Sequence, residues 1–557
     1  MNGMSSSKGR VRVVAVSMAA ALTLGITACT AAATADPSSS TGLAVALGEA
    51  PNQDVVDLYT DRDTAVSAAV DALPQFVEKA LDQTGVPGAQ VAVVSNGQVV
   101  FDEGYGVRDV TTQEPVDVDT VFQIASLSKP LSSSIVAKAI TDDPDLSWDD
   151  PVVAYLPDFT LRDPYVTEHG KIADFFSHRT GIPTGAGDDL EDIGFDADYI
   201  LAHLDQVPLA SFRDTYQYSN FGLTVGGEAV AVSRGQTWAQ TAQELLFEPL
   251  GMTSTTTLHE DYLAADDRAA MHARTGDGRY EQLFDRDADA EAPAGGVAST
   301  AGDIAKWMTM VLADGEVDGA QFIDPLVLAQ TYSAHSITGG DAKNLTSRTS
   351  HYGFGTNVGA TVTGRVNINH SGAFGWGAAT NATMIPDLNL GIVVLTNGAP
   401  SGVPEAIVAE FVDLVQFGAE TRPWLDLWPA RFAEFSDPAG DLVGEEPPTD
   451  AAPTGPAGDY VGTYTSPYFG DFTVSEQNGI LTGALGPDGG YTFELDPWDG
   501  DTLSFVPTGE NALPGSLSSA VFVREGEQIT GVTLTYFNTF PAPDQEPNGL
   551  GVFTRVG

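Results

Sequence analysis

The chain has few cysteines and few basic residues. Its 557 residues include one cysteine, Cys29, so no disulfide can form within the chain. Only 25 lysines and arginines stand against 76 aspartates and glutamates, which gives a formal net charge of -51 at pH 7. Without a basic patch, the general surface is unsuited to binding nucleic acid or an anionic membrane.

Two hydrolase motifs are also missing. The sequence contains no H-E-x-x-H and its eight histidines do not cluster, which argues against a metal hydrolase. It contains no G-x-S-x-G, the nucleophile turn of an α/β-hydrolase. We therefore expect neither a metal ion nor a cofactor.

The first 28 residues have the layout of an export signal. Three basic residues, Lys8, Arg10 and Arg12, precede the apolar run from Val13 to Ile26. This run is shorter than the ~20 apolar residues that a transmembrane helix needs. We therefore predict a signal peptide over residues 1–28 and export from the cytoplasm.

Cys29 follows Ile26-Thr27-Ala28, which resembles a bacterial lipobox. In a lipobox the cysteine is lipidated and becomes the mature N-terminus, so we predict a lipoprotein of the cell membrane. A secreted protein cleaved after Ala33-Thr34-Ala35 is the alternative. Residues 29–55, rich in Ala, Ser, Thr and Pro, then form a flexible tether.

Residues 56–436 have the pattern of an α+β domain. Strand-like runs lie near both ends, and short helices lie between them. The first two runs, in residues 89–108, are joined by Asn96-Gly97, a strong hairpin signal. We expect one antiparallel sheet assembled from both ends, with a helical lobe beside it and a cleft between them.

Residues 437–458 are rich in Pro, Gly, Ala and acidic residues and show no apolar period, which indicates a linker. Residues 459–557 contain seven or eight short strand-like runs separated by turns. This spacing predicts a small closed antiparallel β-barrel whose interior is filled by side chains.

The stretch Ser126-Leu127-Ser128-Lys129 is the strongest candidate for chemistry. On a helix, residues three apart share a face, so the Ser126 hydroxyl and the Lys129 ammonium would be neighbours. The first turn of a helix also presents free N–H groups that favour a developing oxyanion. The spacing alone is weak, since Ser5 to Lys8 matches it as well.

Tyr218-Ser219-Asn220 precedes a helix of small residues and could bring a phenol and an amide into the cleft. A nearby ammonium such as Lys129 would favour ionised Tyr218 or share a proton with it. Asn220 could hold both Lys129 and a substrate amide. Tyr536-Phe537-Asn538 matches the same pattern within the predicted barrel.

His370-Ser371-Gly372-Ala373 ends a predicted strand. Small residues there allow an extended substrate to lie along the strand edge. The Ala373 N–H could join the Ser126 N–H as the second donor to an oxyanion. His351-Tyr352-Gly353 is a competing match.

These triplets, Ser126-Leu127-Ser128-Lys129, Tyr218-Ser219-Asn220 and His370-Ser371-Gly372, resemble the motifs of the class C beta-lactamase and penicillin-binding-protein-like serine hydrolases. That group includes D-alanyl-D-alanine carboxypeptidases, D-aminopeptidases and esterases. The resemblance covers residues 66–418 and includes Ser177-His178-Arg179-Thr180-Gly181, Pro249-Leu250-Gly251-Met252 and Ala294-Gly295-Gly296-Val297. The C-terminal unit resembles the lipocalin-like barrel of some members.

The resemblance implies that Ser126 is the acylated nucleophile and that Lys129 and Tyr218 share the base and acid roles. Asn220 would position the substrate, and His370, Ser371, Gly372 and Ala373 would line the strand side of the pocket. The substrate would be a cell-wall peptide, a D-amino acid amide or an ester.

His370 departs from the lysine that antibiotic-destroying members carry at this position. Histidine is mostly neutral near pH 7, so a substrate carboxylate would lose its anchor. This favours peptidase or esterase activity over beta-lactamase activity. A non-catalytic module on the same fold that binds peptidoglycan fragments or partners is the alternative from another class.

Overall fold

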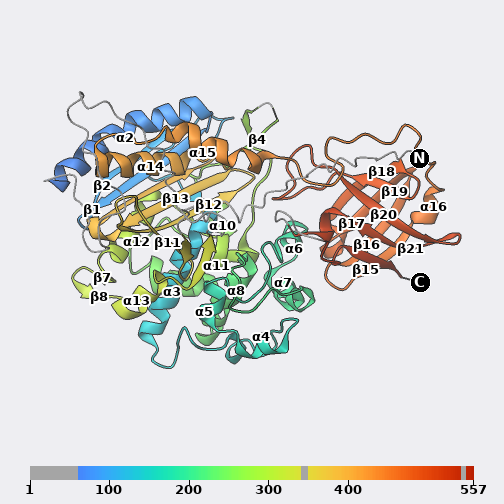
Figure 1. Ribbon diagram of the computed structural model, residues 1–557, viewed down its shortest axis with the longest axis horizontal. Helices are drawn as coiled ribbons and strands as arrows, with labels where there is room; N and C mark the ends of the chain where they lie inside the picture. Colours follow the sequence, from blue (N-terminus) through green and yellow to red (C-terminus); the bar gives the residue numbers. More distant parts are fainter. Residues whose placement is uncertain (1–60, 277, 340–348, 541–546, 557) are drawn as a thin grey trace, which may run out of the picture.

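The computed structural model describes residues 61–276, 278–339, 349–540 and 547–556. Within them the chain forms a sheet-and-helix domain followed by a closed β-barrel (Figure 1). The predicted α+β class with a C-terminal antiparallel barrel is therefore confirmed.

The predicted signal peptide (1–28), the tether (29–55) and the lipidation site Cys29 lie outside the described residues. Ser5 and Lys8, which also match S-x-x-K, lie outside them too. In the part of the chain that the structure describes, no helix combines the length and apolar character that crossing a bilayer requires.

An eight-stranded antiparallel sheet forms the centre of the first domain. Its first and last segments pair directly, with Ala89 opposite Thr396, so the sheet is assembled from both ends of the domain, as predicted. In spatial order the strands are β2 (Gln98–Gly106), β1 (Gly88–Ser95), β14 (Leu390–Thr396), β13 (Ala378–Ile385), β12 (Val366–Phe374), β11 (Asn357–Ala360), β10 (Ser350–Tyr352) and β9 (Ser336–Gly339).

The turn between β1 and β2 consists of Asn96 and Gly97. Both residues have positive φ, 50° and 74° respectively. A two-residue hairpin turn of this kind requires positive φ at both positions, which Asn and Gly adopt at the least cost. The predicted hairpin is confirmed.

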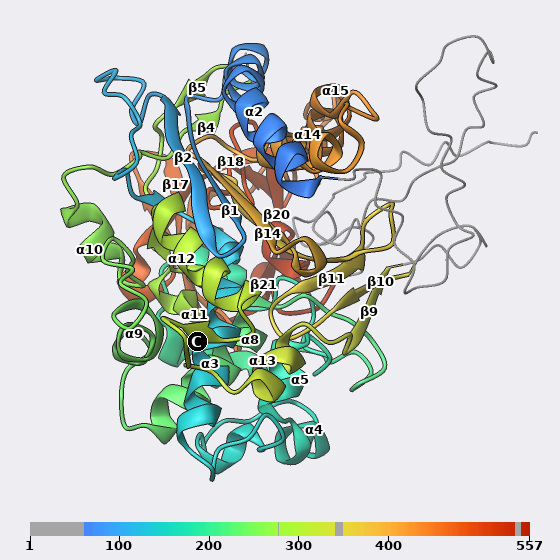
Figure 2. The same cartoon turned by 90° about the vertical axis from the view of Figure 1, so that its left-hand side faces the viewer.

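Strand β1 is buried on both faces because its side chains alternate between two apolar cores. Val91 and Val93 belong to the core under α2 (Arg62–Thr84), α14 (Val403–Phe417) and α15 (Trp424–Phe432). Ala92 and Val94 belong to the core on the other face, under α12 (Ala301–Leu312) and the helical lobe. Figure 2 shows α2 and α14 on one side of the sheet and α12 on the other.

The helical lobe packs against the second face of the sheet. Its central helix, α3 (Ser128–Asp142), is buried along most of its length, including Leu131 and Ile135. The other lobe helices are α4 (Pro164–His169), α5 (Ile172–Phe176), α6 (Asp188–Asp192), α7 (Ala197–His203), α8 (Asn220–Ser233), α9 (Trp238–Ala242), α10 (His259–Ala264), α11 (Ala292–Gly295) and α13 (Pro325–Thr331).

Three two-stranded ribbons complete the first domain. They are β3 (Phe122–Gln123) with β6 (Ala298–Ser299), β4 (Ala273–Arg274) with β5 (Tyr280–Glu281), and β7 (Glu316–Val317) with β8 (Ala320–Gln321). The first ribbon lies directly before the segment that carries Ser126.

The barrel closes where its last strand pairs with its first, with Tyr464 opposite Arg555. Stacked aromatic rings occupy its interior; the ring centroids of Phe493 and Phe505 are 4.5 Å apart. After the short helix α16 (Ala457–Tyr460), the strands are β15 (Gly462–Ser466), β16 (Gly470–Gln477), β17 (Ile480–Leu485), β18 (Tyr491–Asp499), β19 (Thr502–Phe505), β20 (Ser518–Glu525), β21 (Gln528–Leu534) and β22 (Val552–Arg555).

The predicted linker, residues 437–458, is tied to the barrel by hydrogen bonds. The Leu442 N–H donates to the Leu517 carbonyl at 3.1 Å. The hydroxyls of Ser518 and Ser519 each donate to the Asp441 carboxylate at 2.7 Å. The start of this segment therefore follows the start of β20 instead of spanning solvent.

Candidate active site

Ser126 lies in a single 3-10 turn, Ala125–Leu127, directly before α3. The sequence analysis places it slightly later, in the first turn of the helix itself. Ala125 has φ of 48°, a left-handed conformation that costs a non-glycine residue roughly 1–2 kcal/mol. The turn buries Ala125 and Leu127 and leaves Ser126 half-buried at the wall of a cavity.

Strand β12 holds this turn in place through Gly372. A Cβ atom on Gly372 would lie 2.0 Å from the Ile124 carbonyl oxygen and 3.0 Å from the Leu127 nitrogen. The Thr380 hydroxyl, on the neighbouring strand, donates to the same Ile124 carbonyl at 2.9 Å. Only glycine permits the strand and the turn to approach this closely.

Lys129 lies beneath Ser126 and is completely buried. Its Nζ lies 2.9 Å from Ser126 Oγ, 2.8 Å from Asn220 Oδ1 and 3.0 Å from the Ala294 carbonyl oxygen. Burial lowers the Lys129 pKa to about 8, against the opposing charges of Glu291 and Asp188. The amine is therefore poised to exchange a proton with the serine near neutral pH.

Tyr218 covers the Lys129 ammonium, which lies 4.6 Å from the centre of the phenol ring. Burial raises the Tyr218 pKa, and the interaction with Ser126 lowers it by less. The hydroxyl faces Ser126 without a well-formed hydrogen bond to any described residue. The phenol is thus protonated in the resting site, whereas the sequence analysis allows for an ionised base.

Asn220 is the first residue of α8, and the preceding Ser219 caps that helix by accepting from the Gly222 N–H at 3.0 Å. With its Oδ1 on Lys129, the Asn220 amide turns its Nδ2 toward Asp188 Oδ1 at 3.4 Å. The amide is thus fixed in one orientation, beside both Lys129 and the cavity.

His370 does not line the cavity, in contrast to the prediction. It is buried, its Nδ1 donates to the Ser371 carbonyl at 2.6 Å, and its Nε2 accepts from the Tyr352 hydroxyl at 3.0 Å. Burial, together with the Lys129 charge, lowers the His370 pKa to about 3. Both ring nitrogens are used and the imidazole is neutral, so it cannot anchor a substrate anion.

Ser371 also lies away from the cavity, on the part of β12 that contacts α14. Its hydroxyl donates to Glu405 of α14 at 2.7 Å. Ala373, by contrast, does line the cavity. In the described residues β11 pairs with β12 only as far as Asn369, which leaves the Ala373 segment open on that side, as the strand-edge prediction requires.

The competing triplets lie elsewhere. Tyr536–Asn538 forms a 3-10 turn in the barrel with Phe537 in its core. His351 lies on β10 away from the cavity, although its neighbour Tyr352 contacts His370. Arg179, to which the sequence analysis assigns no role, forms an ion pair with buried Asp174 at 2.7 Å.

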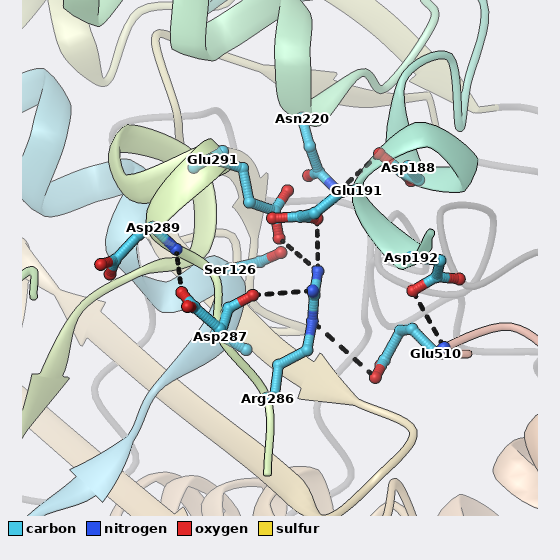
Figure 3. A network of polar contacts seen from close by, with 12 residues as sticks. Ser126, Asp188, Glu191, Asp192, Asn220, Arg286, Asp287, Asp289, Glu291 and Glu510 are labelled. Carbon is cyan, nitrogen blue, oxygen red and sulfur yellow. Dashed lines mark hydrogen bonds and ion pairs between the residues drawn. The ribbon is translucent and has the colours of Figure 1, made fainter. Parts of the chain in front are cut away.

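The sequence analysis missed an acidic wall of the cavity. Asp188, Asp192, Glu291 and Glu510 line it together with one cation, Arg286 (Figure 3). They come from α6, from the segment before α11 that ends in a 3-10 turn (Asp289–Glu291), and from the barrel, so no sequence spacing connects them. Glu291 stands three residues before Ala294-Gly295-Gly296, which the sequence analysis assigns to the family resemblance. This proximity was the one sequence signal that could have pointed to Glu291.

Arg286 lies at the centre of this acidic wall. Its Nη2 is 2.5 Å from Glu191 and 3.3 Å from Glu291, and its Nε is 4.0 Å from Glu510. Burial raises the pKa of Asp188, Asp192 and Glu291, and it raises that of Glu510 to about 8. One guanidinium does not neutralise so many carboxyl groups.

The barrel contributes directly to the cavity through the loop between β19 and β20. Glu510 accepts a hydrogen bond from the Gly375 N–H, and its own N–H donates to Asp192 Oδ1 at 3.0 Å. The Trp376 indole N–H donates to the Gly509 carbonyl at 3.0 Å. Within the described ranges, no group of His, Cys, Asp or Glu side chains has the arrangement of a metal site.

Comparison with known proteins identifies the family of the first domain. The model of the family described as Beta-lactamase matches residues 73–417, and that of a domain of unknown function, DUF3471, matches residues 446–548. The octameric penicillin-binding protein homologue from Pyrococcus abyssi superposes with a TM-score of 0.54 at 19% identity, over 87% of this chain and 100% of its own. At 19% identity this similarity shows a shared fold alone.

Three curated relatives carry activity or family names. Unguisins hydrolase ungD' of Aspergillus campestris is 26% identical over 78% of this chain and 81% of its own length. Penicillin-binding protein 4 of Amycolatopsis lactamdurans is 31% identical over 41% and 60%. D-alanyl-D-alanine-carboxypeptidase/endopeptidase AmpH of Escherichia coli K12 is 25% identical over 60% and 85%.

Proposed function

Because the chain belongs to the beta-lactamase family, we propose that it hydrolyses an amide or ester bond through an acyl-enzyme on Ser126. The contact that supports this proposal is the 2.9 Å separation of Lys129 Nζ and Ser126 Oγ. A hydroxyl becomes a competent nucleophile when a base of suitable pKa lies within hydrogen-bond reach.

In the proposed acylation step, Ser126 Oγ bonds to the substrate carbonyl carbon and its proton passes to neutral Lys129 Nζ. The carbonyl oxygen becomes an oxyanion, and the N–H groups of Ser126 and Ala373 donate to it. The intermediate then expels the leaving group, which takes a proton from the Tyr218 phenol. Tyr218 regains its proton from the Lys129 ammonium.

In the proposed deacylation step, a water molecule replaces the leaving group. Lys129, again neutral, accepts a proton from this water as its oxygen bonds to the acyl carbon. The ester bond to Ser126 breaks, the acid is released and the serine recovers a proton. The sum is hydrolysis with no change in the enzyme.

The neutral His370 favours a peptide, amide or ester over a beta-lactam as substrate. Where lysine would supply a permanent cation for a substrate carboxylate, this chain has a buried imidazole with both nitrogens bonded. We therefore propose a D-aminopeptidase-like, D-Ala-D-Ala carboxypeptidase-like or esterase activity. Beta-lactamase activity is the less favoured candidate, and a non-catalytic peptidoglycan-binding role is the third.

We also propose that the protein is exported and anchored to the cell membrane by a lipid on Cys29. The basic residues ahead of the apolar run and the lipobox-like Ile26-Thr27-Ala28-Cys29 support this. Incorporation of labelled palmitate by the wild type and not by Cys29→Ser is the expected result. Export without incorporation in the wild type would show a secreted protein instead.

A mass measurement tests the catalytic proposal. After incubation with a fluorophosphonate, the intact mass of the wild type should rise by one adduct, and that of Ser126→Ala should not. Ser475→Ala, an exposed barrel serine, is the matched control and should label like the wild type. An adduct that persists in Ser126→Ala would reject Ser126 as nucleophile, and absence of any adduct would favour the binding module.

The acyl donor is then identified with a substrate panel. D-amino acid amides, D-Ala-D-Ala peptides, short p-nitrophenyl esters and nitrocefin separate the candidate activities. Hydrolysis of the amides or esters with at most stoichiometric reaction of nitrocefin is expected. Sustained nitrocefin turnover would instead make beta-lactamase activity the leading assignment.

A further inference from the structure

The cavity beside Ser126 has an excess of acidic groups that its own residues do not balance. Four carboxyl groups line it, those of Asp188, Asp192, Glu291 and Glu510, against the single guanidinium of Arg286. The side chains of Glu291 and Glu510 are only 3% and 9% exposed. Ionising so many buried acids beside one base is costly unless a further cation joins them.

Two of these buried carboxyl groups have an oxygen without a hydrogen-bond donor. Glu291 Oε2 and Glu510 Oε2 accept no hydrogen bond from any described residue. Glu291 uses its other oxygen on Arg286, and Glu510 uses its other oxygen on the Gly375 N–H. Both oxygens are buried, that of Glu510 4.0 Å from Arg286 Nε, and both residues line the cavity. A donor in the cavity reaches these oxygens when the side chains turn toward it.

The lining residues show which part of a substrate would reach this wall. Ser126 and Ala373, where the scissile carbonyl is proposed to lie, line the same cavity as Asp188 and Glu510. A group attached one or two bonds from the carbonyl carbon would then lie in this cavity, which the acidic wall also lines. A substrate carboxylate there would face four acids and one guanidinium that is already paired.

We infer that this wall binds a protonated amine close to the scissile carbonyl, and that the barrel supplies one of its ligands, Glu510. The inference rests on the proposed function and narrows its substrate class to acyl groups with a free amine, as in an amino acid amide or an unblocked peptide N-terminus. An ammonium donates three hydrogen bonds, which matches a wall of unsatisfied carboxylate oxygens.

The acid–base state of the wall is consistent with such binding. Burial raises the Glu510 pKa to about 8, so this group is largely protonated when the cavity is empty near neutral pH. A bound ammonium favours the ionised carboxylate, and binding should then release protons. This makes proton release a second readout of the same event.

A binding measurement on the full chain with Ser126→Ala separates this inference from the catalytic proposal, because no turnover is needed. Calorimetric titration compares alanine amide, a cation, with N-acetylalanine amide, its neutral analogue, in both enantiomers. We expect the cation to bind at least about 10-fold more tightly, as one charge-assisted hydrogen bond provides. Equal or undetectable binding of the two ligands would overturn the inference.

Glu510→Gln, added to Ser126→Ala, tests the role of the barrel. The amide oxygen of Gln can still accept from the Gly375 N–H, so the loop keeps its place while the charge is lost. The preference for the cation should fall about 10-fold, with binding of the N-acetyl compound unchanged. Glu494→Gln, an exposed barrel residue on β18, is the control and should keep the preference.

Each outcome has one meaning. A preference that survives Glu510→Gln would remove Glu510 from the amine site. If the enzyme with native Ser126 is not labelled by the fluorophosphonate, the acyl-enzyme is rejected. The amine preference measured with Ser126→Ala would remain valid. Binding in two buffers with different ionisation enthalpies should reveal the proton release for the cation alone.

Discussion

The hydroxyl of Tyr468, in the barrel, donates a hydrogen bond to Asp189 Oδ1 in the helical lobe at 3.1 Å. The same hydroxyl accepts from the Gly187 N–H at 2.9 Å, and all three residues are buried. Asp189 lies on α6 between Asp188 and Asp192, which line the cavity. The contact therefore joins the barrel to the helix that supplies part of the acidic wall.

Tyr468→Phe should destabilise the chain and weaken this junction. The substitution leaves the Gly187 N–H without an acceptor and leaves Asp189 Oδ1 with the Leu190 N–H alone, at a cost of about 1–3 kcal/mol for the unsatisfied buried group. The measurement is thermal unfolding followed by circular dichroism. Tyr165→Phe is the control, since Tyr165 is 58% exposed. Equal melting temperatures for the wild type and Tyr468→Phe would show that the contact contributes nothing.

Hydrolysis should increase with pH through about 8, because only neutral Lys129 can take the Ser126 proton and burial lowers its pKa to about 8. Below that pH most of the lysine is an ammonium, so kcat/KM falls as pH decreases. The Lys129→Arg substitution introduces a side chain that stays charged, so it should reduce kcat/KM by about 10²–10⁴-fold. Lys138→Arg, on the same helix, is the control. A flat profile from pH 6 to 9 would exclude Lys129 as the base.

His370→Lys should not convert the enzyme into a beta-lactamase. The new ammonium would be buried near Lys129, whose charge already lowers the His370 pKa. An uncompensated buried charge should destabilise the fold by about 3–5 kcal/mol, and it should move the pH midpoint of hydrolysis below that of the wild type. Urea unfolding and a pH profile measure both effects. Unchanged stability with new nitrocefin turnover would contradict this reading of the position.

Local sequence signals predicted the parts of the fold and site that depend on neighbouring residues. Asn96-Gly97 specified a hairpin because both residues accept positive φ. The spacing of Ser126 and Lys129 placed an amine beside a hydroxyl because positions three apart meet on one side of a helical turn. The apolar runs of β1 and β14 indicated strands, although not that each face serves a different core.

The parts that sequence could not predict depend on tertiary contacts. Asp192 and Glu510 are 318 positions apart, yet a hydrogen bond joins them at the cavity. No periodicity links a lobe helix to a barrel loop. His370 is a similar case. The family resemblance implied that it lines the pocket, and only the packed structure shows that its Nε2 accepts a hydrogen bond from the Tyr352 hydroxyl.

Gly372→Ala should damage both stability and catalysis. The added Cβ would lie 2.0 Å from the Ile124 carbonyl oxygen, so β12 and the Ser126 turn must separate. We expect kcat/KM to fall at least about 100-fold, since a displacement near 1 Å at a catalytic group has such an effect. Gly359→Ala on β11, where a Cβ meets nothing within 4 Å, is the matched control. Similar losses in both variants would show that the sheet does not tolerate alanine for glycine in general. The close contact between β12 and the Ser126 turn would then have no specific role.

The pH dependence of stability should reveal the buried carboxyl group of Glu405. Burial raises its pKa to about 7, against the hydrogen bond from Ser371, so the folded chain holds a proton that the unfolded chain releases near pH 4–5. The contribution of this group to stability is therefore complete below its unfolded pKa and is lost as pH rises through about 7.

Glu405→Gln removes this titration while keeping an oxygen that accepts from Ser371. The difference in unfolding free energy, variant minus wild type, should increase between pH 5 and pH 8, because only the wild type loses stability as Glu405 ionises. Urea unfolding at the two pH values measures the difference, and Glu445→Gln, exposed after the start of the linker, should show none. Since Ser371 lies next to His370 on β12, a constant difference for Glu405→Gln would mean that the carboxylate is already ionised beneath the candidate active site at pH 5.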